Sequence, residues 1–197
     1  MFSGKIEDYI LFEDKEIIVC RKPAGIAVQN ARIGAMDLES SLKNYLAMQD
    51  GGGRRIPYLA VIHRLDQPVE GILVFGKTPE AAKSLSAQIT AGKMEKIYLA
   101  VTYGKQAEAG KKEKVLEDYL KKDGKSNTSS VVNAHTPGAK KARLSYEVLG
   151  EAVDAISGKK KWLLRIHLDT GRHHQIRVQM AHAGMPLAGD RKYGAGT

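Results

Sequence analysis

The stretch WLLRIHL at residues 162–168 alternates between two faces. One face is entirely apolar and is formed by Trp162, Leu164, Ile166 and Leu168. The opposite face mixes Leu163 with the polar side chains of Arg165 and His167. Because successive side chains of a strand point to opposite sides of a sheet, this pattern predicts a half-buried β-strand with one face against a core.

Similar patterns predict strands and helices on both sides of this stretch. Two short strands joined by a charged turn are expected over residues 9–21, and single strands over 71–76, 97–103 and 143–149. Helices are expected over 38–48 with Asp37 as the cap, over 78–92 with a buried face of Ala82, Leu85 and Ile89, and over 174–183. The predicted fold class is α+β, with a mixed, mostly antiparallel β-sheet core flanked by helices and loops.

The length of the chain favours one domain. Its 197 residues are 43% hydrophobic, which is enough to bury a core, and we expect a single domain over residues 1–197, or at most one domain with a small appendage. Residues 104–142 are rich in Lys, Gly, Ser and Asn. We expect them to form a basic insertion or arm that contains a weak strand or two.

The net charge of +9 is unevenly distributed. Residues 1–60 carry eight basic and eight acidic side chains, whereas residues 104–197 carry a net charge of +8. A basic half is typical of proteins that bind polyanions, of which nucleic acid is the commonest. A solvated, Lys-rich surface has the same composition, so the charge alone leaves both interpretations open.

Cysteine content and hydropathy indicate the compartment. The single cysteine, Cys20, cannot form an internal disulfide. The N-terminal residues are interrupted by charges, and no apolar run approaches the length of a membrane span. We therefore expect a cytoplasmic protein without a membrane segment.

Three ionisable side chains follow an apolar run at one point in the sequence. His63, Arg64 and Asp66 come directly after Val61-Ile62 and shortly before Pro68. A strand that ended here would place them at the rim of a sheet, where binding and catalytic groups are common. An Arg64–Asp66 ion pair that fixes a loop would explain the same residues.

The segment DTGRHHQIRVQM at residues 169–180 gathers basic side chains near the start of a predicted helix. His174 and Arg177 are three residues apart and therefore share one helix face, where such donors suit a phosphate. A solvated basic helix end is the alternative. We expect no metal site, because the spacing of His173, His174 and His182 is not that of zinc ligands.

Five motifs, taken in order, resemble the RluA-type pseudouridine synthases. They are KPAG at residues 22–25, HRLD at 63–66, EKIYLA at 95–100, TGRHHQIR at 170–177 and HAGMPLAGDRKYG at 182–194. The similarity covers nearly the whole chain. It implies the pseudouridine synthase catalytic fold and the isomerisation of uridine to pseudouridine within a structured RNA, either ribosomal or transfer RNA.

The resemblance also implies roles for particular residues. Asp66 is the catalytic carboxylate, Arg177 pairs with it, and Tyr98 stacks on the uracil, although a tyrosine in an apolar strand is more often part of the core. The residues expected to bind RNA are Arg64, Lys96, Arg172 and His174. The reaction needs no redox change and no group donor, so we expect neither a cofactor nor a metal. We expect a monomer.

Two features depart from the family pattern. Glu70 stands where the family has a small hydroxyl residue, which affects contacts to RNA more than the chemistry. The chain stops at Thr197, so one or two C-terminal strands of the family are expected to be absent. Two alternative functions stay open, a non-catalytic RNA-binding protein with this fold and a hydrolase of small phosphorylated sugars that uses Asp66 and the histidine pair.

Overall fold

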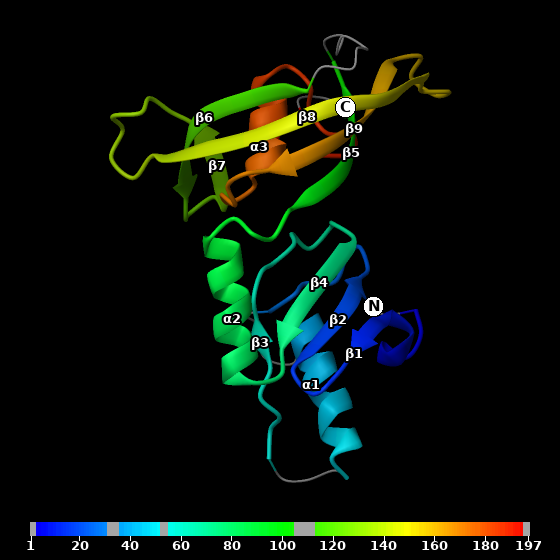
Figure 1. Ribbon diagram of the computed structural model, residues 1–197. Helices are drawn as coiled ribbons and strands as arrows, with labels where there is room; N and C mark the ends of the chain where they lie inside the picture. Colours follow the sequence, from blue (N-terminus) through cyan, green and yellow to red (C-terminus); the bar gives the residue numbers. More distant parts are fainter. Residues whose placement is uncertain (1–2, 31–35, 52–54, 105–112, 195–197) are drawn as a thin grey trace. The chain divides into compact units, whose positions relative to one another are not determined.

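The computed structural model describes residues 3–30, 36–51, 55–104 and 113–194, and the chain divides into two compact units, Met1–Met94 and Glu95–Thr197 (Figure 1). Each unit contains one β-sheet whose named strands pair antiparallel. The predicted α+β class with antiparallel sheets is therefore confirmed. Within the described ranges, no helix combines the length and the apolar character needed to cross a membrane.

The first unit contains a four-stranded sheet in the order β1-β2-β4-β3. Its elements are η1 (Ile6–Tyr9), β1 (Ile10–Glu13), β2 (Ile17–Lys22), α1 (Leu38–Gln49), β3 (Ala60–Val61), β4 (Gly71–Gly76) and α2 (Pro79–Thr90). Helix α1 packs its apolar face on the sheet. The buried cluster that results includes Ile18, Cys20, Leu38, Leu42, Leu46, Leu73 and Phe75.

Both helices of this unit begin at the predicted caps. The Asp37 carboxylate accepts a hydrogen bond from the Ser40 N–H at 2.7 Å, and the Thr78 hydroxyl accepts one from the Ala81 N–H at 3.1 Å. The buried face predicted for α2 is wrong in degree, because Ala82, Leu85 and Ile89 are only partly buried. Helix α2 packs against β4 and the edge strand β3. Few neighbouring elements therefore bury its side chains.

The second unit contains a five-stranded sheet in the order β5-β9-β8-β6-β7. Its elements are β5 (Ile97–Tyr103), β6 (Lys114–Asp123), β7 (Thr128–Val131), β8 (Lys140–Val153), β9 (Lys160–Leu168) and α3 (Gln175–His182). Helix α3 lies across one face of this sheet (Figure 1). The alternation predicted for β9 is confirmed, because its apolar face is buried under α3 with Met180 and its other face is open at Leu163 and Arg165.

Residues 114–131 are more regular than the basic insertion or arm expected over 104–142. Strand β6 pairs with β8 from Lys114↔Tyr146 to Leu120↔Lys140, and β7 pairs with β6. The Lys- and Ser-rich composition gave only a weak strand signal, because these strands are stabilised by pairing with a distant part of the chain rather than by local propensity. Residues 105–112 of the expected arm lie outside the described residues.

A short segment runs along the outer edge of β5. The Tyr103 N–H donates to the Pro186 carbonyl at 3.0 Å, and the Ala188 N–H donates to the Val101 carbonyl at 2.8 Å. Thr102 and Leu187 form an isolated antiparallel bridge between these two bonds. Residues 186–188 therefore satisfy backbone groups of β5 that no other strand pairs with among the residues described.

Candidate active site

Asp66 lies in an irregular segment between β3 and β4. The strand predicted to end in His63, Arg64 and Asp66 is only two residues long, and all three side chains follow it. The Val69 N–H donates to the Asp66 carbonyl at 3.0 Å and closes a turn at the carboxylate-bearing residue. Asp66 is half-buried, whereas Arg64 is exposed.

Residues of β4 contact His63 and Leu65, which precede this turn. The Val74 N–H donates to the His63 Nε2 atom at 3.4 Å, so this nitrogen acts as an acceptor. Leu65 packs against the core of the first unit. A Cβ atom at Gly71 would lie 2.9 Å from the Leu65 Cδ1 atom, so a larger residue here would require the end of the Leu65 side chain to shift.

Lys22 connects the KPAG loop to the Asp66 turn. Its side chain is fully buried, and Nζ donates to the carbonyls of Pro23 at 3.0 Å, Ile26 at 2.6 Å and Gln67 at 3.0 Å. Burial lowers the pKa of the Lys22 ammonium, and the negative charges of Asp66 and Glu70 oppose this shift. The buried cation thus holds a backbone atom of the residue that directly follows Asp66.

The same two loops also exchange hydrogen bonds directly. The Gly25 N–H donates to the Gln67 carbonyl at 2.9 Å, and the Gln67 Nε2 atom donates to the Gly25 carbonyl at 3.0 Å. Gly25 has a φ of +84°, a left-handed conformation that glycine adopts without strain. The KPAG motif therefore acts as the support of the Asp66 turn, a role that the sequence pattern alone did not reveal.

Glu70, the departure from the family pattern, lies beside a cation of β2. Its carboxylate is 3.9 Å from the Arg21 Nη1 atom, and both side chains are more than half exposed. An exposed pair at this distance contributes little to stability. Arg21 nonetheless offsets part of the negative charge that Glu70 adds to this loop.

In the second unit, α3 presents Arg177 to a buried carboxylate. The Arg177 Nε and Nη2 atoms donate to the two Asp190 oxygens at 2.8 and 2.7 Å, a bidentate pair. Burial raises the pKa of Asp190, but hydrogen bonds from Arg177 and from the backbone N–H groups of Lys192 and Tyr193 outweigh it and lower the pKa to about 2. The pairing of Arg177 with Asp66 that the family resemblance implies stays a prediction.

Two adjacent histidines tie the start of α3 to the β6–β7 turn. His174 caps the helix in a left-handed conformation with φ +53°, so it lies before the helix face on which it was predicted. Its Nδ1 atom is 2.7 Å from the Tyr193 hydroxyl, and its ring stacks on His173 at a centroid distance of 3.7 Å. The His173 Nδ1 atom lies 2.8 Å from the Ser129 hydroxyl, and its Nε2 atom lies 3.1 Å from the Asn127 Oδ1 atom.

Lys96 and Arg172, both predicted to bind RNA, lie at one end of the second sheet. Burial lowers the pKa of Lys96, the carboxylate of Asp169 opposes that shift, and Arg172 adds to it. The Arg172 Nε atom donates to the Lys141 carbonyl at 2.8 Å, which orients the guanidinium. Tyr98, two residues beyond Lys96, packs its ring against the apolar core beside Ile166.

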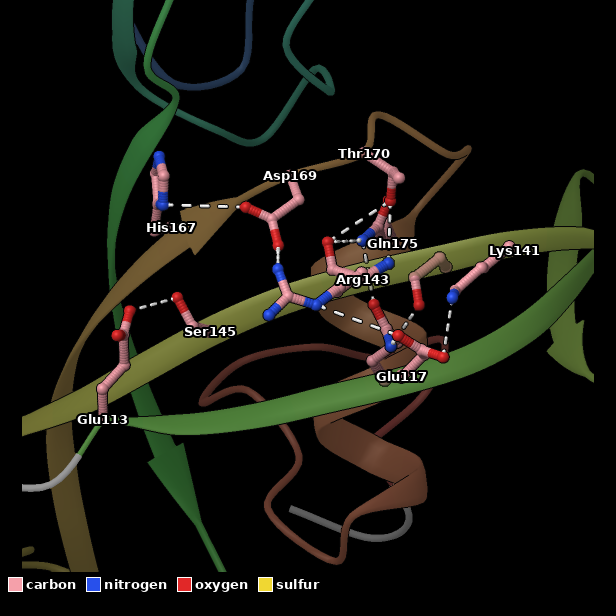
Figure 2. A network of polar contacts seen from close by, with 11 residues as sticks. Glu113, Glu117, Lys141, Arg143, Ser145, His167, Asp169, Thr170 and Gln175 are labelled. Atoms are coloured by element: carbon pink, nitrogen blue, oxygen red, sulfur yellow. Dashed lines mark hydrogen bonds and ion pairs between the residues drawn. The ribbon is translucent and has the colours of Figure 1, made fainter. Parts of the chain in front are cut away.

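A polar network on β6, β8 and β9 continues from this end of the sheet. Figure 2 shows Arg143 between the carboxylates of Asp169 and Glu117, with Lys141 also paired to Glu117 at 2.8 Å. The buried Gln175 side chain donates to the Arg143 carbonyl at 3.0 Å and accepts from the Arg172 N–H at 2.9 Å. The loop that carries Arg172 is thereby fixed to strand β8.

The predicted residues therefore fall into two groups. Arg64 and Asp66 lie in the first unit, and the other five lie in the second. Sequence reasoning did not single out Lys22, which supports the Asp66 turn, or Asp190, which binds Arg177, although both stand within motifs that resemble the family. Across the ranges that the structure describes, no three His, Cys, Asp or Glu side chains gather as candidate metal ligands.

Comparison with known proteins identifies the class of this fold and site. A family model described as RNA pseudouridylate synthase matches residues 16–182, which include both groups of predicted residues. The fold is similar to that of human RNA pseudouridylate synthase domain containing 4, with a TM-score of 0.75 at 23% identity over 98% of this chain and 71% of the other. The chain belongs to the RNA pseudouridylate synthase family, which confirms the predicted resemblance.

Individual relatives carry more specific names. The chain is 33% identical over 192 residues to ribosomal large subunit pseudouridine synthase D of Xylella fastidiosa, which covers 94% of this chain and 51% of the relative. It is also 33% identical over 189 residues to tRNA pseudouridine synthase C of Haemophilus ducreyi, covering 94% of this chain and 73% of the relative. The chain spans about half the length of the first of these relatives.

Proposed function

We propose that this protein isomerises specific uridines of structured RNA to pseudouridine. The observation that carries the proposal is the family match over residues 16–182, which contains Asp66, Tyr98 and Arg177 in the order of the family motifs. In the reaction the N1–C1′ bond of uridine breaks and a C5–C1′ bond forms. The proton at C5 leaves, and N1 takes up a proton, so no redox partner or group donor is needed.

Asp66 serves as the carboxylate of this reaction. The turn closed by Val69 and the support from Lys22 hold its backbone. Attack at C6 of the base, attack at C1′, and assistance of a glycal intermediate are three routes that all use one carboxylate.

Arg177 and Tyr98 complete the chemical group. Arg177 pairs with the Asp66 carboxylate and orients it. Tyr98 stacks on the uracil and accepts the proton lost from C5. The target base has to leave its helix or loop, at a cost of a few kcal/mol, before it reaches these groups.

The basic residues bind the RNA backbone. Arg64 fills the gap that the flipped base leaves or holds the phosphate, and Lys96, Arg172 and His174 contact the RNA backbone. Binding of this kind weakens as salt concentration rises, because less free energy is gained when cations bound to the RNA are released into a solution that already contains many cations. Ribosomal and transfer RNA are the two substrate classes that the names of the relatives suggest, and we place the protein in the cytoplasm as a monomer.

Tritium release from RNA labelled at uridine C5 tests the proposal. Unmodified ribosomal and transfer RNA transcripts are incubated with the wild type, with Asp66→Asn, and with Asp50→Asn as a matched control. Asp50 is an exposed residue at the end of α1 in the same unit. We expect release by the wild type and Asp50→Asn only, with RNA bound equally by all three.

Two outcomes would contradict the proposal. Appreciable release by Asp66→Asn would remove this residue from the chemistry. Wild-type protein that binds RNA but releases no tritium from any transcript would favour a non-catalytic RNA-binding protein.

A further inference from the structure

Glu70 carries an exposed carboxylate directly after the Asp66 turn. The Val69 N–H donates to the Asp66 carbonyl, and a turn closed in this way brings its end Cα atoms within about 7 Å of each other. One further peptide unit adds about 3.8 Å, so the Cα atoms of Asp66 and Glu70 are separated by about 11 Å at most. A nucleotide next to a base that reaches Asp66 would therefore lie within reach of Glu70.

The Glu70 oxygens keep their capacity to accept hydrogen bonds. The Arg21 Nη1 atom lies 3.9 Å from a Glu70 oxygen, which is too long for a hydrogen bond. Arg21 also contacts the Tyr9 ring, whose centre is 5.7 Å from the guanidinium carbon. Arg21 thus offsets part of the charge of Glu70 without occupying its oxygens.

An exposed apolar side chain stands beside this pair. Ile72 is 62% exposed and is the cross-strand partner of Arg21. Directly paired residues point to the same face of a sheet, so Ile72 and Arg21 are neighbours, and Arg21 in turn reaches Glu70. The three side chains offer an apolar surface, an anionic acceptor and a cation. These match the flat face of a base, the donor groups on its edge and the phosphate of one nucleotide.

The chemistry of a carboxylate limits what it can bind in RNA. A negatively charged carboxylate only accepts hydrogen bonds, and its charge repels phosphates. On their Watson–Crick edges, adenine, cytosine and uracil each present one donor group next to acceptors. Guanine presents two parallel donors there, the N1–H and the N2 amino group, which match the two oxygens of a carboxylate. That edge is accessible only in an unpaired guanine.

We propose that Glu70 is a specificity-determining residue, which selects uridines that have an unpaired guanine close to them in the RNA. Glu70 accepts from the guanine edge, Ile72 contacts the face of the base, and Arg21 binds the adjacent phosphate. The proposal rests on the function proposed above, in which Asp66 acts on a base of the RNA. Glu70 stands where the family has a small hydroxyl residue, so this selection is expected to be particular to this chain.

The test compares RNA hairpins that differ in one base. They are copied from ribosomal or transfer RNA transcripts that the protein binds, and each carries a uridine labelled with tritium at C5 in its loop. Guanine, inosine or adenine is placed at each of the two positions on either side of that uridine. Inosine keeps the N1–H of guanine but lacks the N2 amino group, so it removes one donor. Tritium release gives kcat and KM, and filter binding gives the dissociation constant.

The proteins compared are the wild type, Glu70→Ser and the matched control Glu80→Ser. Glu80 is an exposed carboxylate in the first turn of α2. It lies beyond the other end of β4, whose six residues span about 20 Å. Thermal unfolding of Glu70→Ser should match that of the wild type, because the exposed pair with Arg21 adds little stability.

For the wild type, we expect inosine in place of guanine at one position to raise KM and the dissociation constant about tenfold, because a charge-assisted hydrogen bond is lost. The value of kcat should stay within about twofold, since the contact is made equally before and during the reaction. Glu70→Ser should bind guanine and inosine hairpins alike within about twofold, whereas Glu80→Ser should keep the tenfold difference. At low salt, Glu70→Ser should also bind adenine hairpins about twofold more tightly than the wild type, because a charge about 10 Å from a phosphate is removed.

Two results would overturn the proposal. These are a wild type without any preference for guanine over inosine, and a preference that Glu70→Ser retains. If the wild type releases no tritium, the proposed function has failed, and the dissociation constants alone decide whether Glu70 binds guanine. If tritium is released without a preference for guanine, the isomerisation stands and the role of Glu70 has failed.

Discussion

The turn at Asp66 and the surroundings of Arg177 are held by different kinds of contact. In the first unit, the buried ammonium of Lys22 donates to three backbone carbonyls, one of which belongs to Gln67 in the Asp66 turn. In the second unit, side chains bind side chains, as Asp190 binds Arg177 and Arg143 binds Asp169 and Glu117. Three hydrogen bonds are lost at once when Lys22 is replaced, because one residue donates all of them. In a network of separate pairs, replacing one side chain removes only the contacts of that side chain.

The largest expected effect tests the single-residue support. Lys22→Met roughly keeps the length of the side chain but removes every donor, so the buried Ile26 carbonyl loses the hydrogen bond from Nζ. We expect a loss of about 3 kcal/mol in the free energy of unfolding, measured by urea denaturation. Lys43→Met is the control, because its Nζ atom makes only a partly exposed pair with Glu39 on α1, and its cost should stay below about 0.5 kcal/mol. Equal costs in the two variants would show that the first unit, too, distributes its support.

The next effect concerns the buried carboxylate of the second unit. The pKa of Asp190 is lowered to about 2 in the folded protein, so its ionised form stabilises the fold above the unfolded pKa of about 3.9. Asp190→Asn should cost about 2 kcal/mol at pH 7. The difference from the wild type should shrink as the pH falls from about 4 towards 2, where the wild type also becomes protonated. Urea denaturation at pH 7, 4 and 2.5 measures this, and a difference that is independent of pH would contradict it.

A smaller effect tests how closely the Asp66 turn is packed. Gly71→Ala would place a Cβ atom 2.9 Å from the end of the flexible Leu65 side chain, which can shift at a modest cost. We expect about 1 kcal/mol of destabilisation in thermal unfolding. Gly124→Ala in the β6–β7 turn is the control, because its Cβ atom meets nothing within 4 Å. Identical unfolding temperatures for the two variants would show that Leu65 does not constrain the turn.

The smallest effect is expected in the network of Figure 2. The Arg143 side chain is 45% exposed, so solvent screens its pairs with Asp169 and Glu117. Arg143→Met should cost about 0.5 kcal/mol at low salt and less at high salt. Thermal unfolding at two salt concentrations measures both values. A cost as large as that of Lys22→Met would remove the contrast between the two regions.

Local patterns predicted most of the regular structure. The alternation of residues 162–168, the caps at Asp37 and Thr78, and the turn between β1 and β2 all depend on neighbouring residues, and the structure has them. Strands β6 and β7 were underestimated, because their Lys- and Ser-rich sequence becomes a sheet only by pairing with β8. Composition cannot report a partner that is distant in the sequence.

The family motifs predicted the candidate site residues but not their supports. Lys22 is the last residue of strand β2, and its burial depends on carbonyls as far away along the chain as that of Gln67. Asp190 reaches Arg177 from a loop 13 residues along the chain. Neither contact has a local signal, because both arise from how separate segments fold back on one another.

The segment along β5 also bears on how the protein behaves at high concentration. Strand β5 is an edge strand that exposes Ile97, Leu99 and Val101, a combination that favours pairing with other chains and aggregation. Residues 186–188 occupy part of that edge with backbone hydrogen bonds, so they block the addition of a foreign strand. Residues 186–188 therefore protect part of this edge against self-association, and a change that loosens the segment would reduce solubility.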